Sequence, residues 1–149
     1  MNSTRPMQPP ERQPLGFWTV RAGEAIRRRT QGALRDIGMT QPEWWLLHQI
    51  SLHPGGVARN ATVEKIGHND TPRAIVDAIE SAMSKGWISA STSMLTFTIA
   101  GAEQFTRAET LQRELQTERM QGITEDEFAT TILVLQRTIE NVGGDAWHW

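Results

Sequence analysis

The sequence contains no cysteine. This absence excludes disulfide bonds, thiolate zinc sites, cysteine nucleophiles and thiol-based redox sensing. No apolar run approaches the roughly 20 residues that a membrane-spanning helix needs, and the chain does not open on a charged and then apolar leader. We therefore expect a cytoplasmic protein with no membrane partner.

Sequence motifs of catalysis and cofactor binding are also missing. The chain has no G-x-S-x-G elbow, no phosphate-binding loop and no Rossmann glycine fingerprint. Its histidines are scattered, and none forms an i, i+4 pair with another histidine, so we expect no metal and no cofactor. Enzymatic activity is not favoured, but it stays open. His48, close to two tryptophans, is then the candidate general base, because imidazole titrates near neutral pH.

Charge is scarce overall but unevenly distributed. The 149 residues are 38% hydrophobic and 21% charged, which suits one globular domain, and the net charge is −2. Residues 1–39 carry +4, residues 60–101 carry −1 and residues 102–149 carry −5. A basic beginning and an acidic end suggest that the two ends meet, within one subunit or across a dimer.

Hydrophobic periodicity and turn residues predict a mainly α-helical fold. A flexible proline-rich arm at 1–14 precedes it, and we assign this arm no role. The helices are expected at about 17–37, 43–52, 61–67, 72–85, 99–119 and 125–141. A short strand is expected at 57–59, and a hairpin starts at Trp87 and Ile88 and returns through Leu95, Phe97 and Ile99, with a polar tip at 91–93.

Capping residues mark where several of these helices begin. Thr40 with Glu43 and Thr124 with Glu127 form capping boxes. The other expected caps are Asn60, Asp70 or Thr71, and Thr98.

Two helices have informative faces. The second helix is apolar nearly all round, out to Leu52, and is therefore expected to be buried. The fourth helix should bury a stripe of four residues, namely Ile75, Ile79, Ala82 and Met83. Its opposite face then presents Arg73, Ala74, Asp77, Ser81 and Ser84. The segment 60–101 thus has the outline of a winged helix-turn-helix, but its outward face carries Asp77 and Glu80.

Over about residues 17–142 the chain resembles the MarR family of ligand-responsive bacterial repressors. The resemblance rests on five stretches in the family's order: GMTQPEWWLLHQI, TVEKIGH, MSKGWI, TFTIAGAEQF and GITEDEFATTILVLQRTIENV. It implies one domain at 15–142, with a winged lobe at about 55–100 and long N- and C-terminal dimerisation helices at about 17–37 and 100–142. It also implies a homodimer. The tail at 143–149 contains Trp147 and Trp149, which we expect to dock on the first helix or on a partner subunit.

In this family the fourth helix lies in the major groove of double-stranded DNA. The resemblance places Arg73, Ala74, Val76 and Asp77 toward the groove, and only Arg73 has the paired donors that suit guanine. At Asp77, where the family commonly has a basic residue, a carboxylate weakens binding. The wing has no basic residue at its tip, so the remaining cations of the lobe are Lys65 and Lys85, with Arg59 as a possible contributor from the strand.

The family also has a small-molecule cavity beside its first and second helices. The corresponding residues here are Trp18, Arg21, Trp45 and His48, and aromatic walls suit a planar aromatic effector. The alternative is that Trp45 and His48 belong to the ordinary core and that Arg21 pairs with a carboxylate of the tail. Two functions follow: a homodimeric regulator that binds DNA and responds to an effector, or a DNA-independent MarR-like protein that binds or transforms a small molecule.

Overall fold

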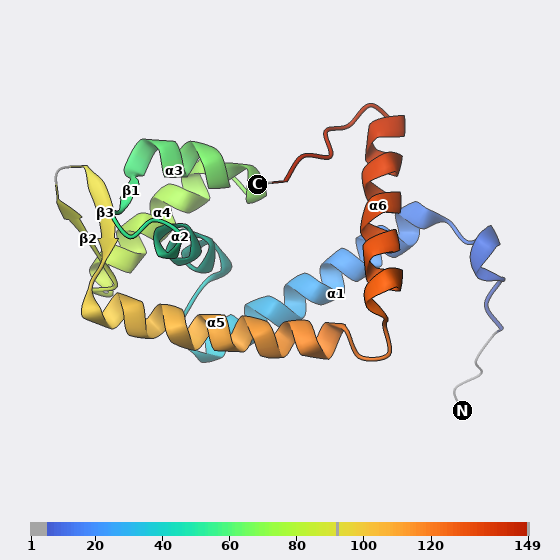
Figure 1. The fold of residues 1–149 in the computed structure, drawn as a ribbon, viewed down its shortest axis with the longest axis horizontal. Helices are drawn as coiled ribbons and strands as arrows, with labels where there is room; N and C mark the ends of the chain where they lie inside the picture. The colour runs from blue at the N-terminus through green and yellow to red at the C-terminus, as the bar shows by residue number, and fades with distance from the viewer. Residues whose placement is uncertain (1–5, 92, 149) are drawn as a thin grey trace. The chain divides into compact units, whose positions relative to one another are not determined.

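The structure is a computed structural model that describes residues 6–91 and 93–148. Its elements in chain order are the 3-10 helix η1 (Pro10–Arg12), α1 (Leu15–Asp36), α2 (Gln41–Ser51), β1 (Val57–Ala58), α3 (Arg59–Ile66), the 3-10 helix η2 (Gly67–Asn69), α4 (Pro72–Ser84), β2 (Ile88–Ser91), β3 (Met94–Phe97), α5 (Ile99–Arg119) and α6 (Glu125–Asn141). Figure 1 shows this order. The mainly α-helical winged fold is confirmed. Arg5 in the arm, Thr92 in the hairpin tip and Trp149 in the tail lie outside the described residues.

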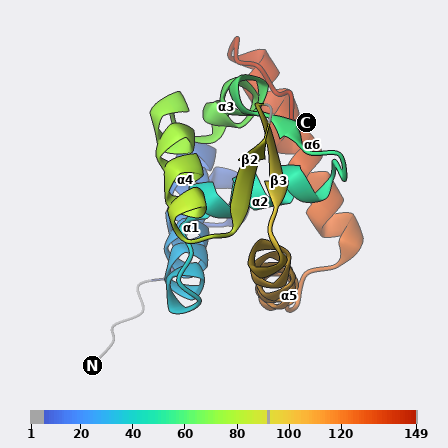
Figure 2. The ribbon, with the colours of Figure 1, turned by 90° about the vertical axis from the view of Figure 1, so that its left-hand side faces the viewer.

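The chain divides into two compact units, one up to residue 112 and one from residue 113 on. The first unit contains the winged lobe. Its small antiparallel sheet has the order β1-β3-β2, in which Leu95 lies opposite both Val57 and Ala90. Figure 2 shows the hairpin of β2 and β3 with α2, α3 and α4 around it. Helix α2 packs against α3 and α4, and the fully buried side chains of this lobe include Leu46, Leu47, Ile75, Ile79 and Leu95.

Local capping accounts for where the helices begin. Thr40 and Glu43 form the expected capping box of α2, and Thr124 and Glu127 form that of α6. Thr98 caps α5, because its Oγ1 accepts a hydrogen bond from the Gly101 N–H at 3.0 Å. These predictions are confirmed.

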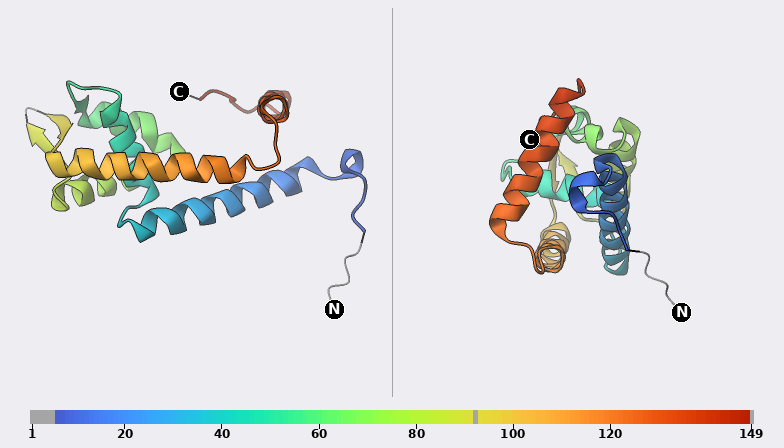
Figure 3. Two further views of the ribbon diagram at one scale, coloured as in Figure 1. Left: turned by 60° about the horizontal axis from the view of Figure 1, so that its bottom comes forward. Right: turned by 90° about the vertical axis from the view of Figure 1, so that its right-hand side faces the viewer.

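Only one end of α1 joins the core of the lobe. Its buried residues, Thr30, Ala33 and Leu34, all lie in its last two turns. The Gln104 amide of α5 donates to the Ile37 carbonyl at 2.8 Å, just beyond this end. The rest of α1 runs outward from the lobe and is exposed (Figure 3).

Gly101 lets α5 begin close to the hairpin. A Cβ atom at this position would lie 1.7 Å from the Trp87 carbonyl oxygen, a distance that no side chain tolerates. The Thr98 N–H donates to the same carbonyl at 3.0 Å. The first turn of α5 is therefore held directly against the backbone that precedes β2.

The second unit contains the end of α5, helix α6 and the tail. Helix α6 ends at Asn141 with Val142 as its C-cap, and Gly143 follows with a left-handed φ of 84°. The expected apolar stripe of α6 is present, but the helix has no buried residue in the single chain. The single domain that the sequence predicts at 15–142 stays a prediction.

Some predictions about individual residues are wrong. Met83 is 40% exposed, since the buried stripe of α4 consists of Ile75, Ala78, Ile79 and Ala82, and Met83 lies one step of about 100° beyond it. Leu52 is exposed as well, because α2 ends at Ser51 and Leu52 leaves the buried face of the helix.

Three boundaries of the winged lobe also differ from the prediction. Ile99 is the first residue of α5 and is 83% exposed, because the cap at Thr98 turns the chain into a helix before it. Trp87 precedes β2 rather than starting it. Arg59 is not in a strand but begins α3, whose N-cap is Ala58 rather than Asn60.

Candidate functional site

The exposed face of α4 is the candidate DNA-reading surface. Helix α4 begins after Thr71, whose Oγ1 accepts from the Ala74 N–H at 3.1 Å, and Pro72 occupies its first turn. Burial of its apolar stripe against α2 and α3 fixes the opposite face toward solvent. On that face Arg73 and Asp77 are exposed, whereas Ala74 and Val76 are half-buried.

Arg73 is paired with Asp77 in the free protein. Its Nε lies 3.0 Å from Asp77 Oδ1, and the two side chains are 81% and 58% exposed. An exposed pair at this i, i+4 spacing contributes only about 0.3–0.5 kcal/mol to stability. A bidentate contact from arginine to guanine is worth about 1–3 kcal/mol of discrimination. The ion pair therefore competes with base reading but is too weak to prevent it.

Lys85 takes part in a partly buried network around Glu43. Its Nζ lies 2.9 and 3.0 Å from the two carboxylate oxygens of Glu43 and donates to the Gly38 carbonyl at 3.1 Å. The Ser81 hydroxyl donates to Glu43 Oε1 at 2.9 Å. Glu43 is only 2% exposed, so its charge depends on these partners.

Lys85, counted from the sequence among the cations of the lobe, is engaged by Glu43 in the structure. Lys85 ties the C-terminal end of α4 to the start of α2 and to the turn before it. The sequence does not predict this network, because Glu43 is already explained by its role in the capping box of α2. The Nζ atom also lies 4.6 Å from the centre of the Trp87 ring.

The other cations predicted to contact DNA are Arg59 and Lys65, both on α3. Arg59 is half-buried, and its backbone N–H is directed toward the Ser93 carbonyl of the hairpin turn at 3.4 Å. Lys65 is exposed on α3. Ser93 adopts a left-handed φ of 64°, and no residue from 88 to 97 is charged. The wing therefore adds no cation to the surface.

Within the single chain the predicted ligand residues lie in two separate places. Trp18 and Arg21 are exposed near the start of α1, roughly 24 Å along the helix axis from Leu34, where α1 enters the core. The Trp18 indole donates to the Gln13 amide oxygen at 2.6 Å, and the Arg21 guanidinium lies 4.9 Å from the centre of the Phe17 ring.

The second pair of predicted ligand residues lies on α2. Trp45 and His48 are half-buried there. The His48 ring lies 5.4 Å from the Trp44 ring, which stacks on Phe105 of α5 at 5.8 Å. This aromatic cluster joins α2 to α5.

No group of three or more His, Asp or Glu side chains within residues 6–91 and 93–148 is arranged to hold a metal ion. No helix in this part of the chain is both long and apolar enough to cross a membrane.

Comparisons with known proteins point to transcriptional regulators. No family model matches the chain. The HTH-type transcriptional repressor Rv2887 of Mycobacterium tuberculosis is 29% identical over 136 residues, which cover 89% of this chain and 95% of the repressor. The chain therefore has the fold of the MarR family of transcriptional regulators.

Solved MarR-family structures share the fold. The structure of Rv2887 in complex with DNA superposes with a TM-score of 0.65 at 24% identity and covers 89% of this chain and 99% of that one. A MarR family regulator from Silicibacter pomeroyi has a TM-score of 0.71 at 14% identity, with 86% and 92% covered. Rv2887 has also been solved with salicylic acid, at a TM-score of 0.61 and 24% identity, with 87% and 98% covered.

Burial perturbs the titration of His48 on α2. Desolvation lowers the pKa of His48 from the ordinary value of 6.5, and the nearby carboxylate of Glu109 opposes this effect. Burial outweighs the carboxylate, so the folded protein prefers a neutral imidazole in the aromatic cluster.

We expect the free energy of unfolding to fall as the pH falls below about 6.5. The unfolded chain then binds a proton that the folded chain takes up only at lower pH, so protonation favours unfolding. The variant His48→Gln should lose less stability over this range. Urea unfolding from about pH 8 to about pH 5.5 measures the difference. His68→Gln, at an exposed position, controls for the loss of an imidazole. If the free energy of unfolding of His48→Gln and of the unmodified protein varied identically with pH, His48 would not be the cause of the pH dependence.

Proposed function

We propose that this protein is a homodimeric MarR-family regulator that acts on promoter DNA in the cytoplasm and responds to a small aromatic ligand. The observation that carries the proposal is the 29% identity to a transcriptional repressor across 95% of the length of that repressor. The match extends over both the winged lobe and the helices outside it. The related protein Rv2887 has been solved with DNA and with salicylic acid.

The exposed start of α4 supports the DNA-binding part of the proposal. Arg73 lies in the first turn of the helix, where side chains reach base edges when such a helix enters the major groove. Lys65 and Arg59 on α3 are the remaining cations for the phosphate backbone. Because the wing adds no charge, we expect α4 to carry most of the specificity.

Exposed apolar side chains support the homodimer. Helices α1 and α6 each carry several large apolar residues that are at least 40% exposed in the single chain: Leu15, Phe17, Trp18, Val20 and Ile26 on α1, and Phe128, Ile132, Leu133, Val134 and Ile139 on α6. Soluble monomers rarely expose so many such residues along helix faces. A second copy of the chain would bury them.

The ligand part of the proposal rests on α1 and α2. Trp45 and His48 are half-buried on α2, and Trp18 and Arg21 lie on the part of α1 that a partner subunit would cover. These residues offer aromatic surface together with a cation and an imidazole. Such a set suits a planar aromatic acid.

Binding to promoter DNA tests the proposal. With the dimer mass established by light scattering, fluorescence anisotropy on promoter fragments of neighbouring genes should give a Kd below about 1 μM. The affinity should fall steeply between about 50 and 200 mM salt. Arg73→Ala should remove the preference for the promoter over a scrambled duplex.

The control variant is Arg28→Ala on the exposed part of α1. Phosphate contacts carry no sequence information, so this variant should keep its sequence preference even if its affinity changes. A monomer, or a dimer that binds all duplexes equally at micromolar Kd, would favour the DNA-independent alternative.

A further inference from the structure

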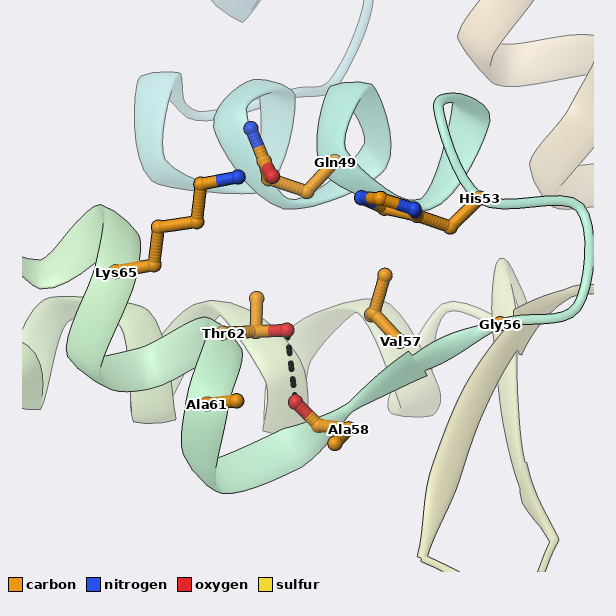
Figure 4. Close-up of a pocket in the computed structure, with 8 residues that line it drawn as sticks. All are labelled: Gln49, His53, Gly56, Val57, Ala58, Ala61, Thr62 and Lys65. Atoms are coloured by element: carbon orange, nitrogen blue, oxygen red, sulfur yellow. Dashed lines mark hydrogen bonds between the residues drawn. The ribbon is translucent and has the colours of Figure 1, made fainter. Parts of the chain in front are cut away.

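A hollow of about 240 Å³ lies in the winged lobe, away from the exposed face of α4. Figure 4 shows its walls: Gln49 and His53 come from α2 and the turn after it, Val57 comes from β1, and Thr62 and Lys65 come from α3. None of the predicted ligand residues lines it. Its volume is below the roughly 300–1,000 Å³ of pockets for drug-sized ligands, so it suits a smaller molecule.

Gln49 is the unusual residue of this hollow. It is only 3% exposed, and among the described residues its side-chain amide has no hydrogen-bond partner. A buried amide without a partner is costly, so such groups normally bind protein or water. Its amide is not fully sealed inside the protein, and the Gln49 side chain lines the hollow.

The polar groups around Gln49 favour an anion. The Lys65 side chain extends from α3 toward Gln49, and the imidazole of His53 lies on the same side as Gln49 (Figure 4). Lysine supplies up to three donors and the glutamine amide two, and an imidazole has at least one N–H. None of the lining residues is acidic. The charge of the hollow is therefore positive.

The opposite wall is apolar. Val57 and the methyl group of Thr62 face the hollow in Figure 4, while the Thr62 hydroxyl is turned away because it donates to the Ala58 carbonyl at 2.8 Å. An inorganic anion would leave this apolar wall in contact with water. A carboxylate attached to a small apolar body would satisfy both walls.

We propose that this hollow binds a small monocarboxylate, with its carboxylate on Lys65 and the Gln49 amide and its apolar body on Val57 and Thr62. The site goes beyond the proposed DNA and effector functions, and its occupancy can be measured without DNA. A failure of DNA binding would therefore leave this test unaffected.

Benzoate is the probe, and two-dimensional NMR of the full-length protein gives a readout at the site. We expect benzoate to shift the Gln49 side-chain amide and the His53 ring signals saturably, with a Kd on the order of 1 mM or tighter. Benzamide has the same shape without the charge, and acetate has the charge without the ring. Each should bind at least about tenfold more weakly than benzoate.

Two variants test whether Lys65 and Gln49 bind the carboxylate. Lys65→Met should weaken benzoate at least about tenfold, whereas Arg28→Met, which removes an exposed cation on α1, should leave the affinity unchanged. Gln49→Leu should also weaken binding, while its melting temperature stays equal or rises because an unpaired buried amide has been removed. Equal binding of benzoate and benzamide, or unchanged affinity in Lys65→Met, would overturn the proposal.

Discussion

Replacing Lys85 with methionine is expected to lower the free energy of unfolding by about 3 kcal/mol. The substitution leaves the Glu43 carboxylate, 2% exposed, without its cation and leaves the Gly38 carbonyl without its donor. Removing one partner of a buried ion pair costs about 3–5 kcal/mol, and the 37% exposure of the Lys85 side chain places the expected loss at the lower end. Urea unfolding followed by circular dichroism, at one fixed protein concentration, measures it.

Lys65→Met is the matched control, because it makes the same chemical change at an exposed position of the same lobe. Its free energy of unfolding should stay within about 0.5 kcal/mol of the unmodified protein. The double variant Glu43→Leu/Lys85→Met should recover more than half of the loss, since it removes both charges from the interior. A loss below about 1 kcal/mol in Lys85→Met would show that water already satisfies Glu43.

The caps were predictable from sequence because they depend on residues three apart. Thr40 with Glu43, Thr124 with Glu127, and Thr98 with Gly101 all form the expected hydrogen bonds. The same holds for most helix boundaries, which follow from proline, glycine and apolar spacing. Short-range chemistry therefore determines where α2, α5 and α6 begin.

Interactions between distant positions were not predictable in this way. Glu43 and Lys85 are separated by 42 residues, and neither spacing nor composition connects them. The burial of Gln49 beside the hollow also depends on how α2 meets α3 and β1. By contrast, the i, i+4 spacing of Arg73 and Asp77 is visible in the sequence, and their pairing follows from it.

The fold places the predicted DNA-reading residues together but keeps the predicted ligand residues of α1 apart from those of α2. Arg73, Ala74, Val76 and Asp77 share the first turns of α4, as the helical pattern requires. Trp18 and Arg21 lie on the exposed part of α1, far along the helix from its buried end. In the proposed homodimer a partner subunit would complete the surroundings of these residues, and no pattern within one sequence specifies that arrangement.

Asp77→Asn is expected to raise the affinity for promoter DNA about tenfold per half-site, and hence about a hundredfold for a dimer. The substitution removes a carboxylate from the face of α4 that is proposed to meet DNA, and it frees the Arg73 guanidinium from its ion pair. The dependence of log Kd on log salt should become steeper by about one unit per half-site. Anisotropy titrations over a range of salt concentrations measure both quantities.

Glu80→Gln distinguishes the two contributions. Glu80 is exposed on the same helix, and its substitution removes one carboxylate without releasing Arg73. We expect it to raise affinity less than Asp77→Asn, because only long-range repulsion is relieved and salt screens that repulsion. Equal gains from both variants would mean that the Arg73–Asp77 pair does not limit base reading. A loss of affinity in Asp77→Asn would mean that this carboxylate accepts a hydrogen bond from a cytosine amine and itself reads the operator.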